Sequence, residues 1–125
     1  MKAYGDAERD VAEHLPLSAR DFHILFALAA GEAHGYGLVK QISAQTEGAI
    51  ELDPANLYRA LQRMVDRELI RDAGRRPSPE AARSRRYYEL TGMGRRVLAA
   101  EAERMRSLAR AAEARRLIPE GRGER

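Results

Sequence analysis

The chain has 125 residues, which is enough for one small domain, and its formal net charge at pH 7 is +3. It has no cysteine, which excludes disulfides and thiolate chemistry, and it has no apolar run near the ~18 residues of a membrane span. Because the first residues are acidic and polar and do not resemble a signal peptide, a cytoplasmic location is expected.

The N-terminal part predicts an extension followed by a core helix. Residues 1–16 are polar and weakly periodic, so a short helix and a partly disordered segment are both open. Ser18 then occupies the position of a helix N-cap. Apolar residues follow at helical spacing, among them Phe22 and Phe26, and Gly31 supplies a stop. We therefore expect the first core helix between Ser18 and Gly31.

A second helix is predicted from Gly35 to Thr46, with Leu38, Val39 and Ile42 turned inward. Residues 50–52 are a short apolar segment, and we expect them to form an edge strand of a small sheet.

Asp53 and Pro54 are a strong start signal for a third helix, because the carboxylate can cap free N–H groups and proline suits the first turn. This helix is expected to extend to about Arg67. Its apolar residues have helical spacing and should be buried, whereas Arg59, Arg63 and Arg67 recur every four residues. Exposed arginines alone would indicate only a solvated surface, but an arginine-rich loop follows nearby, and together they favour DNA binding.

That loop spans residues 73–84 and joins two predicted strands, residues 69–71 and 85–90. In the second strand, alternation predicts that Tyr88 is in the core and Tyr87 is exposed. A helix with an arginine face followed by an arginine-tipped hairpin is typical of a winged-helix DNA-binding domain. In such a domain the helix enters the major groove and the hairpin lies on the backbone.

The distribution of charge supports this interpretation. Residues 1–53 contain four Lys or Arg and nine Asp or Glu, a net −5, whereas residues 54–125 contain eighteen and ten, a net +8. The basic charge therefore lies in the half that carries the predicted helix and hairpin, as expected for a polyanion partner.

The last predicted element is a helix that begins after Thr91 and extends to about Leu117, roughly 40 Å at ~1.5 Å per residue. Such a helix is too long to pack on one small domain. An extended solvated helix is the alternative, but long helices usually need a packed face, so a dimerisation helix is favoured. Four residues approximate a seven-residue apolar seam and form the predicted dimer interface: Leu98, Met105, Leu108 and Ala112.

The predicted fold is thus mainly α with a small β-hairpin. A winged helix-turn-helix DNA-binding domain spans residues 17–91, after the extension at 1–16. A C-terminal dimerisation helix spans 92–118, and a disordered tail spans 119–125.

Three stretches of the chain resemble PadR-type transcriptional regulators, a family of bacterial winged-helix dimers. They are His34-Gly35-Tyr36-Gly37-Leu38, then Leu57-Tyr58-Arg59-Ala60-Leu61 with Leu69-Ile70, and Arg86-Tyr87-Tyr88-Glu89-Leu90-Thr91 followed by Gly94-Arg95-Arg96. The resemblance covers roughly residues 17–100. It implies a homodimer that binds double-stranded operator DNA of two-fold symmetry and represses nearby genes. In some relatives it also implies release by a small-molecule effector, such as a phenolic acid or a drug.

The resemblance also implies residue roles. Tyr36, Lys40, Tyr58 and Arg63 would contact DNA, mostly at phosphates, and Asn56 and Arg59 would lie near base edges. The five arginines of the predicted hairpin, Arg75, Arg76, Arg83, Arg85 and Arg86, are called the wing arginines. With them, the predicted DNA-binding set is Tyr36, Lys40, Asn56, Tyr58, Arg59, Arg63, Arg75, Arg76, Arg83, Arg85 and Arg86.

The chain departs from the family pattern in three ways. Ala55-Asn56 stands where relatives often have Gly followed by Thr or Ser, and Asn can read adenine bidentately. Glu68 replaces a common Gly at the end of the recognition helix. The chain has no Trp, so a drug pore walled by stacked Trp is not available.

No enzyme is predicted. His14, His23 and His34 stand at no metal-ligand spacing, and there is no glycine-rich phosphate loop or nucleophile elbow. No catalytic residue, cofactor or metal ligand is therefore assigned. Two alternatives remain open: a winged helix whose basic surface meets an acidic protein, and a metal-responsive repressor with a site built across a dimer.

Overall fold

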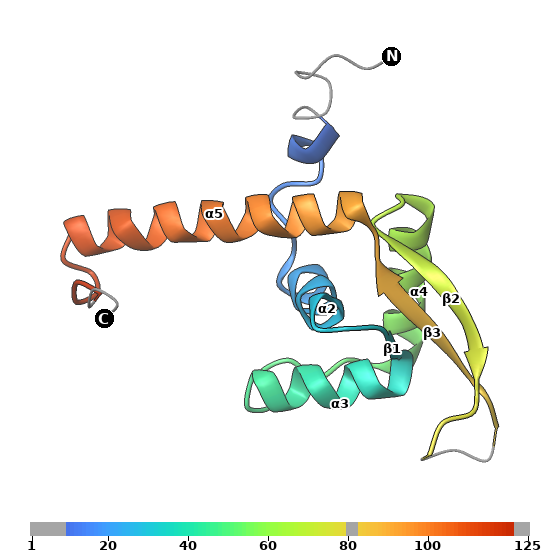
Figure 1. The fold of residues 1–125 in the computed structure, drawn as a ribbon. Helices are drawn as coiled ribbons and strands as arrows, with labels where there is room; N and C mark the ends of the chain where they lie inside the picture. The colour runs from blue at the N-terminus through green and yellow to red at the C-terminus, as the bar shows by residue number, and fades with distance from the viewer. Residues whose placement is uncertain (1–9, 80–82, 122–125) are drawn as a thin grey trace.

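The structure is a computed structural model that describes residues 10–79 and 83–121. Residues 10–12 are helical and precede the main elements. These are α2 (Ala19–Ala29), β1 (Ala33–His34), α3 (Gly35–Gln45), α4 (Pro54–Asp66), β2 (Ile70–Arg76), β3 (Arg85–Leu90) and α5 (Gly92–Ala114). Figure 1 shows α2, α3 and α4 gathered beside a small sheet, with α5 crossing one end and extending away from them. The fold is the mainly helical, winged one that the sequence predicts.

Each of these helices begins at a residue whose side chain accepts a hydrogen bond from a backbone N–H three residues on. These N-caps are Ser18, His34, Asp53 and Thr91. Three of them were predicted from the sequence, because Ser, Asp and Thr are common caps. His34 is the exception: its Nδ1 accepts from the N–H of Gly37 at 3.0 Å.

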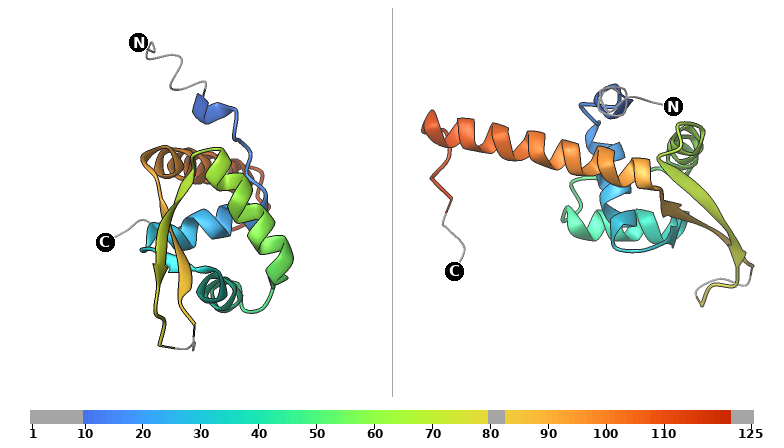
Figure 2. Two further views of the ribbon diagram at one scale, coloured as in Figure 1. Left: turned by 90° about the vertical axis from the view of Figure 1, so that its right-hand side faces the viewer. Right: turned by 45° about the horizontal axis from the view of Figure 1, so that its top comes forward.

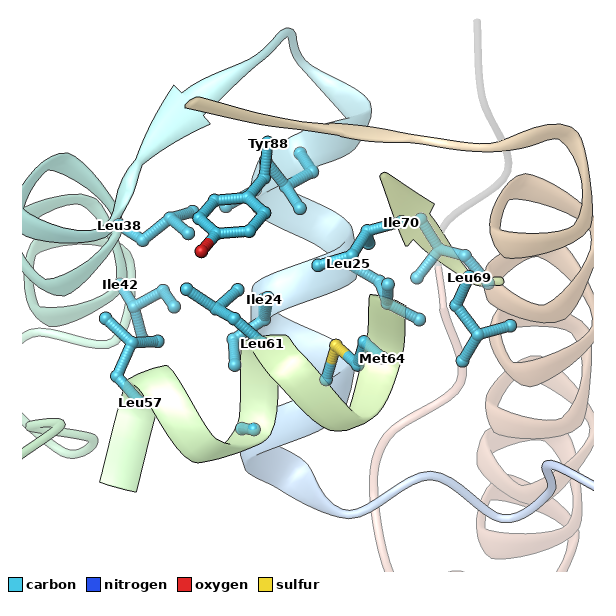
Figure 3. Packing of buried hydrophobic residues seen from close by; sticks show 14 of the residues in the cluster. Ile24, Leu25, Leu38, Ile42, Leu57, Leu61, Met64, Leu69, Ile70 and Tyr88 are labelled. Atoms are coloured by element: carbon cyan, nitrogen blue, oxygen red, sulfur yellow. The ribbon is translucent and has the colours of Figure 1, made fainter. Parts of the chain in front are cut away.

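One buried apolar cluster joins the helices to the sheet (Figure 3). Ile24 and Leu25 from α2 pack there with residues of α3 and α4, and Tyr88 of β3 lies among them at 8% exposure, as predicted. Phe26 was expected in this core, but it is 49% exposed and stacks on Phe22 with ring centroids 5.5 Å apart. The reason is the phase of the helix: α2 turns Ile24, Leu25, Ala27 and Leu28 inward, so Phe26 faces outward.

The sheet has the order β1-β3-β2 and is antiparallel throughout. Its third strand is Ala33–His34, opposite Tyr88 and Tyr87, and not residues 50–52, which form no strand. The prediction for 50–52 was therefore wrong. The Thr46 hydroxyl accepts a hydrogen bond from Ile50 N at 3.0 Å, and this holds the segment to the end of α3.

The hairpin is longer than predicted. Strand β2 continues to Arg76, so Gly74, Arg75 and Arg76 belong to the strand and not to the loop. The register shifts between Asp72 and Gly74, where a bulge inserts one residue. Gly74 has a φ of 96°, which glycine adopts without steric cost, and its N–H donates to Asp72 Oδ1 at 2.7 Å. Strand pairing therefore continues beyond the bulge, where Arg75 pairs with Arg86 and Arg76 with Arg85.

Helix α4 ends at a residue with a left-handed backbone. Glu68 has a φ of 62°, the N–H of Leu69 donates to the Met64 carbonyl at 3.0 Å, and the N–H of Glu68 donates to Val65 at 2.9 Å. This is the hydrogen-bond pattern of a helix C-terminus that prefers glycine. It gives a physical reason for the glycine that relatives often have here.

Replacing Glu68 by glycine is therefore expected to stabilise the fold. The left-handed conformation costs a residue with a side chain about 1–2 kcal/mol, and glycine loses about 0.5–1 kcal/mol more entropy on folding. The net gain should be about 0.5–1 kcal/mol in the free energy of unfolding, measured with urea. Glu68→Ala is the matched control, because it removes the same carboxylate but keeps the strain. An equal gain in both variants would contradict the backbone explanation.

Helix α5 has 23 residues, about 35 Å at ~1.5 Å per residue. It ends at Ala114 and not at Leu117 as predicted, because Arg116 adopts a φ of 60° and the N–H of Leu117 turns back to the Ala112 carbonyl at 2.9 Å. Within the described residues, no helix is both long enough and apolar enough to span a membrane.

Candidate nucleic-acid interface

Helix α4 and the hairpin lie side by side and face the same side of the molecule (Figure 2). Between them is an open concavity lined by Tyr58 of α4 and by hairpin residues on both sides of the tip. Five residues of the predicted DNA-binding set line it: Tyr58, Arg75, Arg83, Arg85 and Arg86. The fold thus brings together arginines that the sequence separates from α4 by a strand.

The start of α3 adjoins this basic surface. The Arg85 guanidinium carbon lies 5.0 Å from the centroid of the Tyr36 ring, and Lys40 Nζ lies 5.3 Å from the same centroid. Tyr58 reaches α3 because Gly35 has no side chain: a Cβ at Gly35 would lie 2.7 Å from the Tyr58 hydroxyl. Tyr36 and Tyr58 are 44% and 48% exposed, so two aromatic rings with polar ends lie among the cations.

Three arginines of the predicted set are already paired with carboxylates of the chain. Arg63 of α4 contacts Asp21 of α2 at 3.4 Å. The other two pairs join Arg76 to Glu32 and Arg86 to Asp72. Each carboxylate lowers the net positive charge that its arginine presents to a phosphate, although the guanidinium keeps further N–H donors for a second partner.

The carboxylate of Asp72 is held ionised. The hydrogen bond from the Gly74 N–H lowers the pKa of Asp72, and Arg86 lowers it further through a hydrogen bond and its charge. The hydrogen bond that Arg76 donates to Glu32 raises the pKa of Arg76. Asp72 and Arg76 therefore both carry their charges at neutral pH.

The remaining cations of the set make no ion pair with any carboxylate in the described residues. Lys40 and Arg85 lie against Tyr36, while Arg75 and Arg83 are exposed. The Arg85 Nε atom is buried and has no hydrogen-bond partner within the described residues. The exposed guanidinium groups of Arg75 and Arg83 offer N–H donors of the kind that phosphate oxygens accept.

Asn56 and Arg59 are exposed in the first turns of α4, the part of a recognition helix that usually meets base edges. The Arg59 guanidinium donates to Asn56 Oδ1. Bidentate reading of adenine needs both the oxygen and the amide N–H of Asn. Because Asn56 Oδ1 is occupied by Arg59, the side chains of this turn of α4 offer mainly hydrogen-bond donors to a base.

Tyr87 was expected to be exposed but is half-buried. Its ring packs edge-on against His34, with centroids 5.2 Å apart, and the Arg76 guanidinium carbon lies 4.1 Å from its centroid. The short strand β1 explains the difference, because it pairs with the edge of β3 and places His34 directly opposite Tyr87.

The four residues of the predicted dimer seam occupy different environments. Leu98 is 8% exposed and packs in the core of its own domain. Met105 and Leu108 are 38% and 56% exposed, and Ala112 is half-buried. Figure 1 shows why: the second half of α5 runs past the rest of the molecule. Only this outer part of the seam presents an apolar surface.

Among residues 10–79 and 83–121, no group of three or more His, Cys, Asp or Glu side chains is arranged to hold a metal ion. His34 is used as a helix cap, and His23 contacts Phe22 edge-on. The metal-responsive alternative therefore gains no support from the described part of the chain.

Residues 24–100 match the model of the Transcriptional regulator PadR-like family, and no curated protein matches significantly. A PadR family transcription regulator from Clostridium difficile is 25% identical, with a TM-score of 0.65 over 78% of this chain and 97% of that one. A Streptococcus transcriptional regulator is 23% identical, with a TM-score of 0.65 over 78% and 91%.

Bacillus subtilis PadR, whose structure is a complex with operator DNA, shares the fold. It is 20% identical, with a TM-score of 0.57 over 68% of this chain and 47% of that one.

Proposed function

The chain belongs to the PadR-like family of transcriptional regulators, and from this premise we propose that it binds operator DNA as a homodimer and represses adjacent genes. The observation that carries the proposal is the basic concavity between α4 and the hairpin. It combines a helix of major-groove size with cations that can lie on the adjoining phosphates. The complex of Bacillus subtilis PadR with operator DNA is consistent with this use of the fold.

In this proposal, each protomer inserts the first turns of α4 into the major groove. Asn56 and Arg59 read base edges there, because they are exposed at the N-terminal end of the helix. The wing arginines, Tyr36 and Lys40 hold the backbone. Two protomers related by two-fold symmetry would place half-site centres about 34–36 Å apart, or a multiple of that distance. A small-molecule effector, if the protein uses one, binds without tryptophan stacking, since the chain has no Trp.

Single substitutions should distinguish the residues that read DNA bases from those that contact the DNA backbone. Arg75→Ala and Arg83→Ala are each expected to weaken binding to operator and scrambled duplex equally and to reduce the salt slope by about one unit. Asn56→Ala and Arg59→Ala should instead lower the preference for operator by ~1–3 kcal/mol. The measurement is affinity for both duplexes across a salt series.

Arg110→Ala is the control, because it removes the same charge from the far end of α5. The assigned roles would be reversed if the hairpin variants lost affinity only for operator while the α4 variants lost affinity equally for operator and scrambled duplex. If the unmodified chain shows no salt-dependent binding to any duplex, the DNA proposal is wrong, and a contact of the basic surface with an acidic protein becomes the favoured alternative.

Arg86 allows a sharper version of the same test. Removing Arg86 also leaves the Asp72 carboxylate unpaired beside the DNA. Arg86→Ala should therefore weaken binding more than Arg75→Ala, and the added Asp72→Asn substitution should recover part of the loss. A double variant as weak as Arg86→Ala alone would contradict the repulsion by Asp72.

A further inference from the structure

Helix α5 carries one acidic residue with no exposed surface, Glu101. Its Oε2 accepts from the backbone N–H of Leu17 at 3.2 Å and from Arg104 Nη2 at 2.9 Å, and its Oε1 accepts from Arg104 Nε at 2.7 Å. Three directed hydrogen bonds thus hold one buried carboxylate. The hydrogen bonds from Arg104 hold the pKa of Glu101 below its usual value, and burial opposes this shift only in part. The carboxylate is therefore charged when the protein is folded at neutral pH.

We call the three hydrogen bonds of Glu101 the clamp. The position of Glu101 in the fold gives the clamp a mechanical role. It lies one turn beyond Val97 and Leu98 and is the last buried residue of α5. Residues 102–110 are exposed, apart from the half-buried Arg104. Glu101 therefore ends the buried part of α5, and Figure 1 shows the rest of the helix extending away from the body of the molecule.

Leu17, the partner of Glu101 outside α5, connects through α2 to the DNA-binding helix α4. Leu17 directly precedes Ser18, the cap of α2. From α2, Asp21 contacts Arg63 of α4 at 3.4 Å, and α2 also supplies much of the core beneath α4. A path of hydrogen bonds and packed residues thus runs from the outer part of α5 to the recognition helix.

We propose that Glu101 is a positioning residue for operator recognition: its carboxylate, held in place by Arg104 of the same helix, accepts the hydrogen bond from Leu17 N that fixes the angle between α5 and the DNA-binding body, and so sets the half-site spacing that the dimer accepts. The inference rests on the proposed function, namely a dimer joined through α5 that binds two half-sites.

The physical reason is the difference between apolar and polar contacts. Apolar packing by Val97 and Leu98 is not directional, so it permits small rotations of the body against α5. The hydrogen bond from Leu17 N to the buried carboxylate restricts those rotations, because it weakens steeply with angle, and Arg104 of the same helix fixes the carboxylate that accepts it. Each α4 lies at a distance from the two-fold axis, so a small rotation at the clamp moves it along the groove.

The test uses the full-length protein and duplexes in which the two half-sites of a selected operator are separated by spacers changed one base pair at a time. The main variant is Glu101→Gln, which keeps the shape of the side chain but removes its charge. Arg104→Gln is the second variant, because Arg104 is 40% exposed and a glutamine there can still donate one hydrogen bond to the Glu101 carboxylate. The matched control is Glu103→Gln. Glu103 pairs with Arg106 at 3.2 Å on the same helix with the same spacing, but both side chains are 64% exposed.

For the unmodified protein and Glu103→Gln, we expect the wrong spacer to weaken binding about tenfold or more, which corresponds to ~1.4 kcal/mol. For Glu101→Gln and Arg104→Gln, the difference between best and wrong spacers should shrink severalfold, while affinity for a single half-site stays unchanged. Light scattering and thermal unfolding identify which variants are dimeric and folded, and if Glu101→Gln does not fold, Arg104→Gln decides.

A folded, dimeric clamp variant with the spacer dependence of the unmodified protein would overturn this inference alone. Failure of the unmodified protein to dimerise or to prefer any spacing would overturn the proposed function as well.

Discussion

Replacing Gly94 by alanine is expected to destabilise the protein by about 3 kcal/mol or more, the upper range for overpacking of a rigid site. Gly94 is buried in the first turn of α5. A Cβ there would lie far inside contact distance of the Leu69 carbonyl oxygen, and 2.9 Å from both the Leu69 carbonyl carbon and Leu90 Cδ1. The Leu69 carbonyl cannot simply move away, because it accepts a hydrogen bond from Thr91 N at 3.1 Å. The added methyl group must therefore separate α5 from the start of the hairpin.

Urea unfolding of the two glycine variants at the start of α5 measures this effect. Gly92→Ala is the matched control, since a Cβ at Gly92 meets no atom within 4 Å. It should change the free energy of unfolding by no more than about 0.5 kcal/mol, as expected for an exposed site. Similar stability of the two variants would show that α5 is not seated on Leu69 as described.

Local signals in the sequence predicted the helix starts well. Ser18, Asp53 and Thr91 act within three residues of their position, so their role as caps does not depend on the rest of the fold. The two wrong predictions, a strand at residues 50–52 and a buried Phe26, concern features that depend on the tertiary structure. A strand of two residues such as Ala33–His34 has no recognisable pattern, and helical spacing alone does not fix which face of α2 is buried, as Phe26 illustrates.

For the candidate site, the sequence predicted which residues are basic and that the fold gathers them around α4. It could not predict which of them are neutralised. Arg63 pairs with Asp21, which is 42 positions away, and Arg76 pairs with Glu32 across the sheet, and these contacts depend on tertiary structure. Glu101 was missed for a related reason: a charged residue in a polar helix is normally exposed, and only its contact with Leu17 and Arg104 permits burial.

Replacing Leu108 by glutamate is expected to convert a dimer into a monomer at micromolar concentration. Leu108 and Met105 form the exposed apolar part of the predicted seam, on the half of α5 that extends beyond the body. In a two-fold interface each substitution occurs twice. An uncompensated charge at such a contact costs several kcal/mol. We therefore expect the dimer dissociation constant to rise about a hundredfold or more, equivalent to ~2.7 kcal/mol.

Light scattering across a concentration series measures this change, and Ser107→Glu is the matched control, because it adds the same charge at an exposed position outside the seam. The monomeric variant should keep its affinity for a single half-site but lose most of its affinity for the full operator, since the second contact no longer benefits from being tethered to the first. A Leu108→Glu protein that remains as dimeric as Ser107→Glu would show that the outer half of α5 is not the interface. The protomers would then have to meet through another surface, such as the N-terminal segment, and the spacing argument built on Glu101 would no longer apply.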